Sequence, residues 1–173
     1  MNARFSGVPT RASRGNAVGR SNRPKRLTTS PCSRAILASV ERRDIEKLVE
    51  RWANEAITQG RLEAFDELLA PDVLDRSAPA TSQGLDSFKA RAAAVRTAFS
   101  EIEMRVEDLL VDGDAIAWRW ALTGTHVGNF AGVAPTGRRV TLRGVNFQRL
   151  RGQRVAEHWT LADVFGVTHA LRG

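Results

Sequence analysis

The segment EHWTLAD, residues 157–163, carries the carboxylate best suited to acid–base chemistry. The two-residue period of a β-strand places four of its side chains on one face: Glu157, Trp159, Leu161 and Asp163. Strands disfavour aspartate and protein cores disfavour unpaired carboxylates, so Asp163 is unusual there. If this face lines a pocket, burial makes the carboxylate a stronger base, as removal of a proton from carbon requires. The alternative is that Asp163 ends the strand at the surface.

His126 is the second candidate for chemistry. It shares the parity of Trp118 and Trp120 along a preceding strand, so it could lie at the mouth of an aromatic-lined pocket. There it could donate to a substrate carbonyl or pair with Asp163, and a structural hydrogen bond at a strand end is the alternative. His158 falls on the face opposite to Asp163, and we expect it to be exposed.

Aromatic side chains and one arginine form the candidate substrate-binding set. Trp118, Trp120 and Trp159 would supply flat apolar walls, and Phe130 would add to them from the glycine-rich segment 124–140. Arg119, between the two tryptophans, either stabilises oxyanion charge or points to solvent. The three histidines are dispersed and Cys32 is the single cysteine, so we expect neither a metal site nor an internal disulfide.

These residues need elements to hold them. Apolar residues at three- and four-residue steps predict helices over residues 39–59, 61–70 and 85–99, with an irregular segment over 72–83 between the last two. The period then changes to two, which predicts strands at 102–111, 115–126, 139–150 and 155–165, with tight turns at 112–114 and 151–154. Three helices and four antiparallel strands predict an α+β fold whose long, twisted sheet curls around the helices and leaves a concave face.

Charge divides the chain of 173 residues into an extension and a domain. Residues 1–40 hold eight basic and no acidic residues, whereas the rest has a net charge of −1. We interpret 1–40 as a disordered basic N-terminal extension: a nonfunctional stretch, a weak polyanion-binding arm or a transit peptide. Residues 41–173 form one nearly neutral domain, so nucleic-acid binding is not expected of it. No apolar run is long enough to cross a bilayer, and we expect a cytoplasmic protein.

Two segments, GTHVGNFAGVAPTGRRV and GVNFQRLRGQRVAEHWTLAD, resemble the SnoaL-like polyketide cyclase family of the nuclear transport factor two-like superfamily. The resemblance runs from about residue 42 to the end. FDELLAPDVLDRSAP is similar to the family's early loop, where an Asp-His pair is common and this chain has Asp75-Arg76. Arg119 is followed by Ala121 and not by the aspartate of the related limonene-epoxide-hydrolase-like enzymes, which argues against epoxide hydrolysis.

The resemblance implies a cone-shaped α+β barrel, or cystatin-like roll, with N-terminal helices packed on a curved antiparallel sheet and a homodimer formed through that sheet. In characterised cyclases of the family an aspartate on the last strand is the acid–base in an intramolecular aldol ring closure, without cofactor or metal. Asp163 matches that position. His126 has no such match and is a candidate on geometry alone.

Three functions follow from these patterns. The first is a cofactor-independent cyclase that acts on a hydrophobic, polyketide-like small molecule. The second is a non-catalytic domain of the same fold that binds a small molecule or a second copy. The third is weak nucleic-acid binding through residues 1–40.

Overall fold

The computed structural model describes residues 41–173, so the predicted basic extension lies outside the described residues. The first helix, α1 (Arg42–Arg51), continues without a break into a π-helical segment, η2 (Trp52–Thr58). Together they occupy the range predicted for the first helix. The inward residues Ile45, Leu48 and Val49 recur at the spacing of one helix face, and all three are buried.

The second predicted helix is shorter than expected. The chain makes a 3-10 turn, η3 (Leu62–Ala64), and one turn of helix, α2 (Phe65–Leu68), and then extends as strand β1 (Leu69–Asp75). The expectation of irregular structure from residue 72 was therefore wrong as far as Asp75. Pro71 is tolerated because β1 is an edge strand. The third helix, α3 (Gly84–Ala98), lies where predicted.

The sheet has the order β1-β5-β4-β3-β2. Its long strands are β2 (Phe99–Asp112), β3 (Ala115–His126), β4 (Arg139–Arg151) and β5 (Arg154–Ala162), each antiparallel to the next, whereas β1 runs parallel to β5. Both predicted tight turns are present. Register shifts interrupt β2, and bulges of this kind bend a strand. The prediction of an α+β fold with a curved sheet is confirmed, with one more strand than expected.

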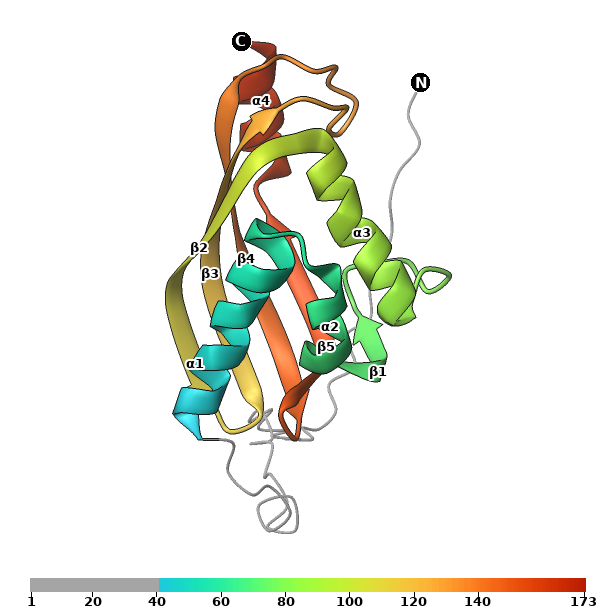
Figure 1. Ribbon diagram of the computed structural model, residues 1–173, viewed down its shortest axis with the longest axis vertical. Coiled ribbons are helices and arrows are strands. Elements are labelled where there is room, and N and C mark those ends of the chain that lie inside the picture. The colour runs from blue at the N-terminus through green and yellow to red at the C-terminus, as the bar shows by residue number, and fades with distance from the viewer. Residues whose placement is uncertain (1–40) are drawn as a thin grey trace, which may run out of the picture.

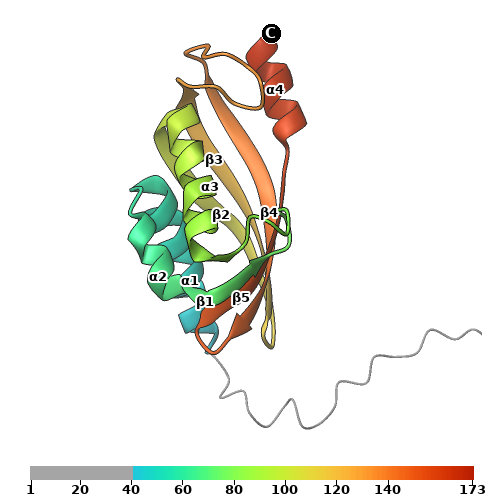
Figure 2. The same cartoon turned by 90° about the vertical axis from the view of Figure 1, so that its right-hand side faces the viewer.

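The last predicted strand is too long. β5 ends at Ala162, and a helix that was not predicted, α4 (Val164–Arg172), follows it. Helices α1, α2 and α3 cover one face of the sheet, and α4 lies at the far end on the other side (Figure 1 and Figure 2). We call the face under α1–α3 the inner face and the opposite one the outer face.

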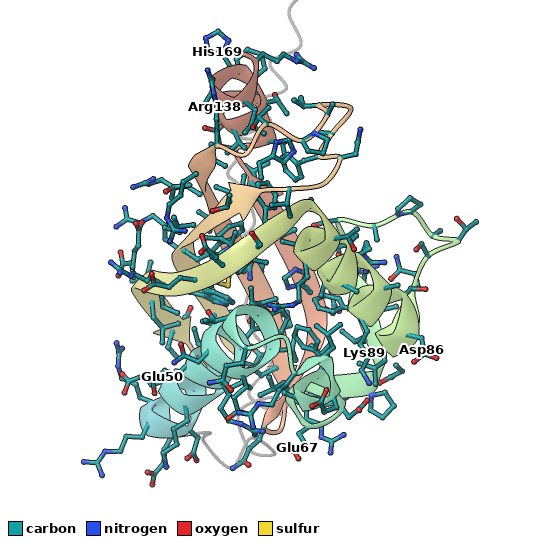
Figure 3. All side chains as sticks on the ribbon, turned by 45° about the horizontal axis from the view of Figure 1, so that its top comes forward. Glu50, Glu67, Asp86, Lys89, Arg138 and His169 are labelled. Atoms are coloured by element: carbon teal, nitrogen blue, oxygen red, sulfur yellow. The ribbon has the colours of Figure 1, made fainter. Side chains whose placement is uncertain are left out.

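The core lies between the inner face and α1–α3. Trp52 packs edge-on against Phe65, Phe88 and Trp118, with ring centroids 5.0, 5.4 and 6.0 Å away. Charged side chains such as Glu50, Glu67 and Asp86 are exposed on the helices (Figure 3). The helices therefore act as a cover that turns the inner face into an enclosed surface.

Candidate functional site

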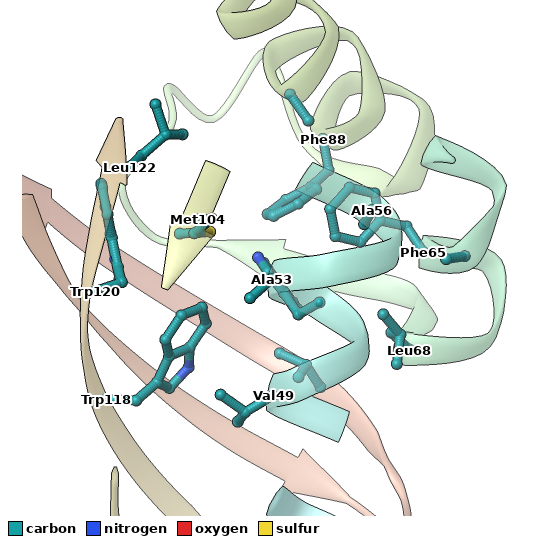
Figure 4. Close-up of a cluster of buried hydrophobic side chains, with 14 of the residues drawn as sticks. Val49, Ala53, Ala56, Phe65, Leu68, Phe88, Met104, Trp118, Trp120 and Leu122 are labelled. Atoms are coloured by element: carbon teal, nitrogen blue, oxygen red, sulfur yellow. The ribbon is translucent and has the colours of Figure 1, made fainter. Parts of the chain in front are cut away.

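A cavity of about 250 Å³ lies between the helices and the inner face and opens to solvent. Most of its wall is apolar, and Figure 4 shows four of the side chains that line it: Phe88, Met104, Trp120 and Leu122. Its polar side chains come from adjacent strands and from α3: Asp75, Arg91, Asn146, His158 and Thr160. An apolar cavity with a few convergent polar groups is the usual form of a small-molecule site.

Asp75, the last residue of β1, is the buried carboxylate of the cavity. Its Oδ2 accepts from Arg91 Nη2 at 2.5 Å, and its Oδ1 accepts from the backbone N–H of Ser77 at 2.9 Å. Gln83 fixes the backbone of the same residue, because its amide both donates to and accepts from Asp75 at 2.8 Å. The site therefore holds one carboxylate and one guanidinium as an ion pair, in a fixed position.

Two buried amides on β4 are paired with the two tryptophans of β3. Trp120 Nε1 donates to Asn146 Oδ1, and Trp118 Nε1 donates to Gln148 Oε1, each at 3.0 Å. Gly144 makes room for this arrangement, because a Cβ there would lie 2.3 Å from Cζ2 of Trp120. The amide oxygen of Asn146 is thus occupied by the indole, and its Nδ2 has no partner among residues 41–173.

His158, on β5, connects this pattern to Asp75. Its Nδ1 lies 3.1 Å from Gln148 Nε2, and its ring stacks on Trp52 at 5.4 Å. Burial lowers the pKa of His158 to about 4, with smaller opposing effects of the Asp75 charge, which raises it, and of Arg91, which lowers it. The ring is therefore neutral at pH 7. Its Nε2 has no partner among the described residues.

Asp163 does not line the cavity, and the prediction that it faces inward was wrong. The residue is exposed and is the N-cap of α4, where its Oδ1 accepts from Gly166 N at 2.8 Å. The reason is a bulge in β5. The pairing of Leu150 with Val155 is followed by that of Arg149 with Glu157, so Ala156 is an extra residue. Each residue of β5 after the bulge therefore lies on the face opposite to the one that strict two-residue alternation predicts.

His158 is affected by the same reversal, and the expectation that it is exposed was wrong. It is 4% exposed and shares the inner face with Thr160 and Ala162. Trp159 lies instead on the outer face, where it packs against Phe147 at 5.4 Å. The predicted role of Trp159 as a wall of the pocket is therefore wrong.

His126 and Phe130 lie outside the cavity, at the far end of β3. His126 is fully buried, its Nδ1 is 3.1 Å from Thr136 Oγ1, and Phe99 packs between its ring and that of Phe130. Among residues 41–173, Nε2 of His126 is the one side-chain N or O atom that is wholly inaccessible to solvent and has no hydrogen-bond partner. Neither residue borders the cavity, so their predicted places at the pocket were wrong.

The remaining predicted binding residues divide between the two faces of β3. Trp120 lines the cavity as expected, and Trp118 is buried beneath it in the core. Arg119 is 58% exposed on the outer face and pairs with Glu107 at 3.1 Å, so it cannot reach a ligand in the cavity. Of the predicted site residues, Trp120 alone borders the cavity.

Five site residues were given no role from the sequence: Asp75, Arg91, Asn146, Gln148 and His158. A usable signal did exist in two of them. Asn146 and Gln148 are two residues apart, like Trp118 and Trp120, and buried amides at that spacing need donors at the same spacing on a neighbouring strand.

Residues 41–173 have no cluster of three or more His, Cys, Asp or Glu side chains that could hold a metal ion. None of the helices in this part of the chain has the length and apolar character needed to span a bilayer.

A curved sheet that wraps around N-terminal helices and encloses a cavity defines an α+β barrel of the nuclear transport factor two-like class. The family model for SnoaL-like polyketide cyclases matches residues 47–171, and the chain belongs to this family.

Relatives with known names and solved structures agree with this placement. The chain is 31% identical over 123 residues to nogalonic acid methyl ester cyclase of Streptomyces nogalater, covering 67% of this chain and 89% of that protein. IdmH of Streptomyces antibioticus superimposes with a TM-score of 0.65 at 28% identity, covering 74% of this chain and 98% of its own. TsrD of Streptomyces laurentii, at 23% identity and a TM-score of 0.71, shares the fold over 76% of this chain and 97% of its own.

Proposed function

We propose that the protein closes a ring in a hydrophobic, polyketide-like compound by an intramolecular aldol reaction that needs no cofactor. The observation that supports this most is the buried carboxylate of Asp75 in a largely apolar cavity that also contains uncharged polar groups. An aldol ring closure needs a base for a C–H bond between carbonyls, hydrogen-bond donors for the resulting oxyanion, and a wall that holds the molecule folded.

The reaction uses one proton and returns it. Asp75 removes a proton from the carbon between two carbonyls, and the electron pair of that C–H bond forms an enolate. The free Nδ2 of Asn146 donates to the enolate oxygen, and the enolate carbon then attacks a second carbonyl of the same molecule. The new C–C bond converts that carbonyl into an alkoxide, which takes the proton back from Asp75.

The charges in the cavity favour an uncharged substrate. Arg91 is already paired with Asp75, so no free cation meets a carboxylate among the lining residues of the described chain. A substrate with a free carboxylate would therefore lose its hydration in the cavity without gaining a cationic partner. An ester carries no charge and needs no such partner. The relative from Streptomyces nogalater is named for a methyl ester, which fits the same preference. We propose an esterified polyketide as the substrate class.

The test is turnover of nogalonic acid methyl ester, followed by mass spectrometry of the ring-closed product. Asp75→Asn should lower kcat by roughly 10²- to 10⁴-fold, the usual contribution of a positioned base. Asp72→Asn is the matched control, because Asp72 lies on the same strand, is exposed and pairs with Arg151. Full turnover by a folded Asp75→Asn variant would remove Asp75 from the reaction. Tight binding of the ester without any product would favour the non-catalytic alternative.

We propose further that two copies associate through the outer face of the sheet. Large apolar side chains are exposed there and on the adjoining α4, including Phe147 at 39%, Val145 at 45%, Leu161 at 79% and Phe165 at 81%. An apolar patch of this kind marks an interface, and a two-fold contact would pair it with itself. Light scattering should give the mass of a dimer for the wild type and of a monomer for Leu161→Glu. A monomeric wild type would contradict the proposal.

A further inference from the structure

We propose that Trp118 and Gln148 are positioning residues that fix the proton of His158 on Nε2, so that this ring acts as an uncharged hydrogen-bond donor to the substrate. The catalytic part of this inference rests on the proposed function. The position of the proton does not, because it follows from the hydrogen bonds of the protein alone.

The argument is a chain of forced donors and acceptors. An indole N–H can only donate, so the atom of Gln148 that faces Trp118 at 3.0 Å must be the amide oxygen. The other end of that amide is then an NH₂ group, which can only donate. It lies 3.1 Å from Nδ1 of His158, so Nδ1 must accept and carries no proton. A neutral imidazole with a bare Nδ1 has its hydrogen on Nε2.

The reversed arrangement is unfavourable for the same reason. Turning the Gln148 amide over would set its NH₂ group against the indole N–H, two donors facing each other in a buried place. Trp118 and Gln148 are 1% and 0% exposed, so water cannot relieve that contact. The amide orientation is therefore fixed by Trp118, and the tautomer of His158 is fixed by the amide.

The charged groups around His158 leave the ring neutral. Asp75 faces it from β1 and Arg91 from α3, and these two are paired with each other. Trp52 and Phe88 pack on the ring from η2 and α3 and bring no ionisable group. Burial lowers the pKa of His158 to about 4, in agreement with a neutral ring at the pH of the cell.

The same device occurs a second time beside it. Trp120 holds Asn146 by its oxygen and so directs the amide NH₂ away from the indole, as Trp118 does for Gln148. Asn146 borders the cavity directly. Gln148 does not border it, but its amide bonds to His158, which does, and so sets the tautomer of that ring. The two tryptophans thus determine the polarity of two cavity groups, and both groups are uncharged donors.

This polarity decides what His158 can do in the reaction. Its Nδ1 is occupied by Gln148 and its Nε2 already holds a proton, so the ring has no free site that could take a proton from carbon. It can donate a hydrogen bond to an enolate or alkoxide oxygen. The base must then be a different group, in agreement with the role proposed for Asp75.

The test is the tautomer of His158 in the full-length protein without substrate, read from the two imidazole ¹⁵N shifts at pH 7. The His158→Gln spectrum assigns the signals by their loss. The wild type should show a neutral ring with a protonated Nε2 and a bare Nδ1. In Gln148→Glu, an ionised carboxylate still accepts from Trp118 but presents an acceptor to His158, so Nδ1 should gain a proton at a pH at which that carboxyl is ionised. A proton on Nδ1 in the wild type would overturn the inference.

We call the chain of hydrogen bonds from Trp118 through Gln148 to His158 the relay. Two matched variants distinguish an effect of this relay from a loss of packing. Trp118→Phe and Trp120→Phe both remove an indole from the same strand, but only the first removes the donor to Gln148. Trp118→Phe should give a mixture of tautomers, and Trp120→Phe should keep the proton on Nε2. Equal changes in both variants would show that packing alone sets the tautomer.

Kinetics connects the relay to the reaction. Gln148→Glu should lower kcat on the order of 10²-fold, as loss of one oxyanion donor does, with a much smaller change in KM. If no polyketide ester is turned over but the wild-type proton is on Nε2, the proposed function fails and the relay stands. If turnover occurs and the proton is on Nδ1, the relay fails and the proposed function stands.

Discussion

Acid should destabilise this protein through His158. The native ring has a pKa of about 4, against 6.5 for an ordinary histidine, so between these values the unfolded chain binds a proton that the folded chain does not. The free energy of unfolding therefore rises with pH in this window. Above pH 6.5 neither the folded nor the unfolded chain binds this proton, so it does not affect the free energy of unfolding. As the pH falls from 6.5 to 4, the free energy of unfolding decreases. The difference between the two values, at about 1.4 kcal/mol per pH unit, corresponds to about 3 kcal/mol.

The assay is urea unfolding followed by tryptophan fluorescence at several values between pH 7 and pH 4. Other groups also titrate in this range, so the informative quantity is the difference between the wild type and His158→Gln, which cannot be protonated. The wild type should lose about 3 kcal/mol more than this variant over the window. His169→Gln is the matched control, because His169 is exposed on α4 and should leave the wild-type slope unchanged.

One result would refute the reasoning. If the wild type and His158→Gln lose the same free energy of unfolding on acidification, the native ring takes up its proton as readily as a histidine in water. Burial would then not keep the ring neutral. The uncharged donor described above would then be the main form only above the ordinary histidine pKa of 6.5, and the agreement between a neutral His158 and Asp75 as the separate base would be lost.

Two other substitutions test the geometry. Gly144→Ala should lower the free energy of unfolding by roughly 1–3 kcal/mol, because its Cβ would lie 2.3 Å from the Trp120 ring and 2.7 Å from the carbonyl oxygen of Leu161; urea unfolding measures the loss. Unchanged stability would mean that Trp120 is free to move. Asp163→Ala should lower it by about 1 kcal/mol through loss of the α4 cap, with turnover within a few-fold of the wild type. A folded Asp163→Ala variant without activity would restore the catalytic role expected from the family resemblance.

The long elements could be predicted because each carries its own pattern. Helix α1 and strand β3 show their periods within the segment, and both lie where the sequence placed them. Short elements that depend on partners remote in sequence could not be predicted in this way. Strand β1 contains Pro71 and is held by parallel pairing with β5, which is remote in sequence. Helix α4 has one local signal, an N-cap aspartate, and that same aspartate was predicted to lie within the last strand.

The site could be predicted only in part, because a strand pattern tells which residues share a face but not which face is buried. Trp159 and Leu161 are more apolar than His158 and Thr160, so the outer face of β5 looked like the inner one. In most sheets the apolar face is the buried one. Here the inner face of β5 borders a cavity, and its polar side chains are the ones that the site uses.

The register of β5 against β4 also explains why Trp159 and Asp163 were predicted on the wrong face. The turn at Gly152 pairs Arg151 with Arg154 and Leu150 with Val155, and counting onward from there would pair Gln148 with Glu157. That register would put Trp159 and Asp163 on the inner face, as strict two-residue alternation along β5 predicts. The extra residue Ala156 shifts the pairing by one, so that His158 lies opposite Gln148.

The tryptophan–amide pairs depend on a different register. Strands β3 and β4 are joined by the glycine-rich segment 127–138 and not by a tight turn, so no local rule fixes their alignment. The observed alignment sets Trp120 opposite Gly144 and Trp118 opposite Asn146, and each indole then reaches the amide two residues further along β4. A shift of one residue would send both amides to the outer face and leave both indoles without an acceptor. The buried donors and acceptors are therefore themselves a reason for this alignment, and the same bonds that fix the register of β4 also orient the groups of the cavity.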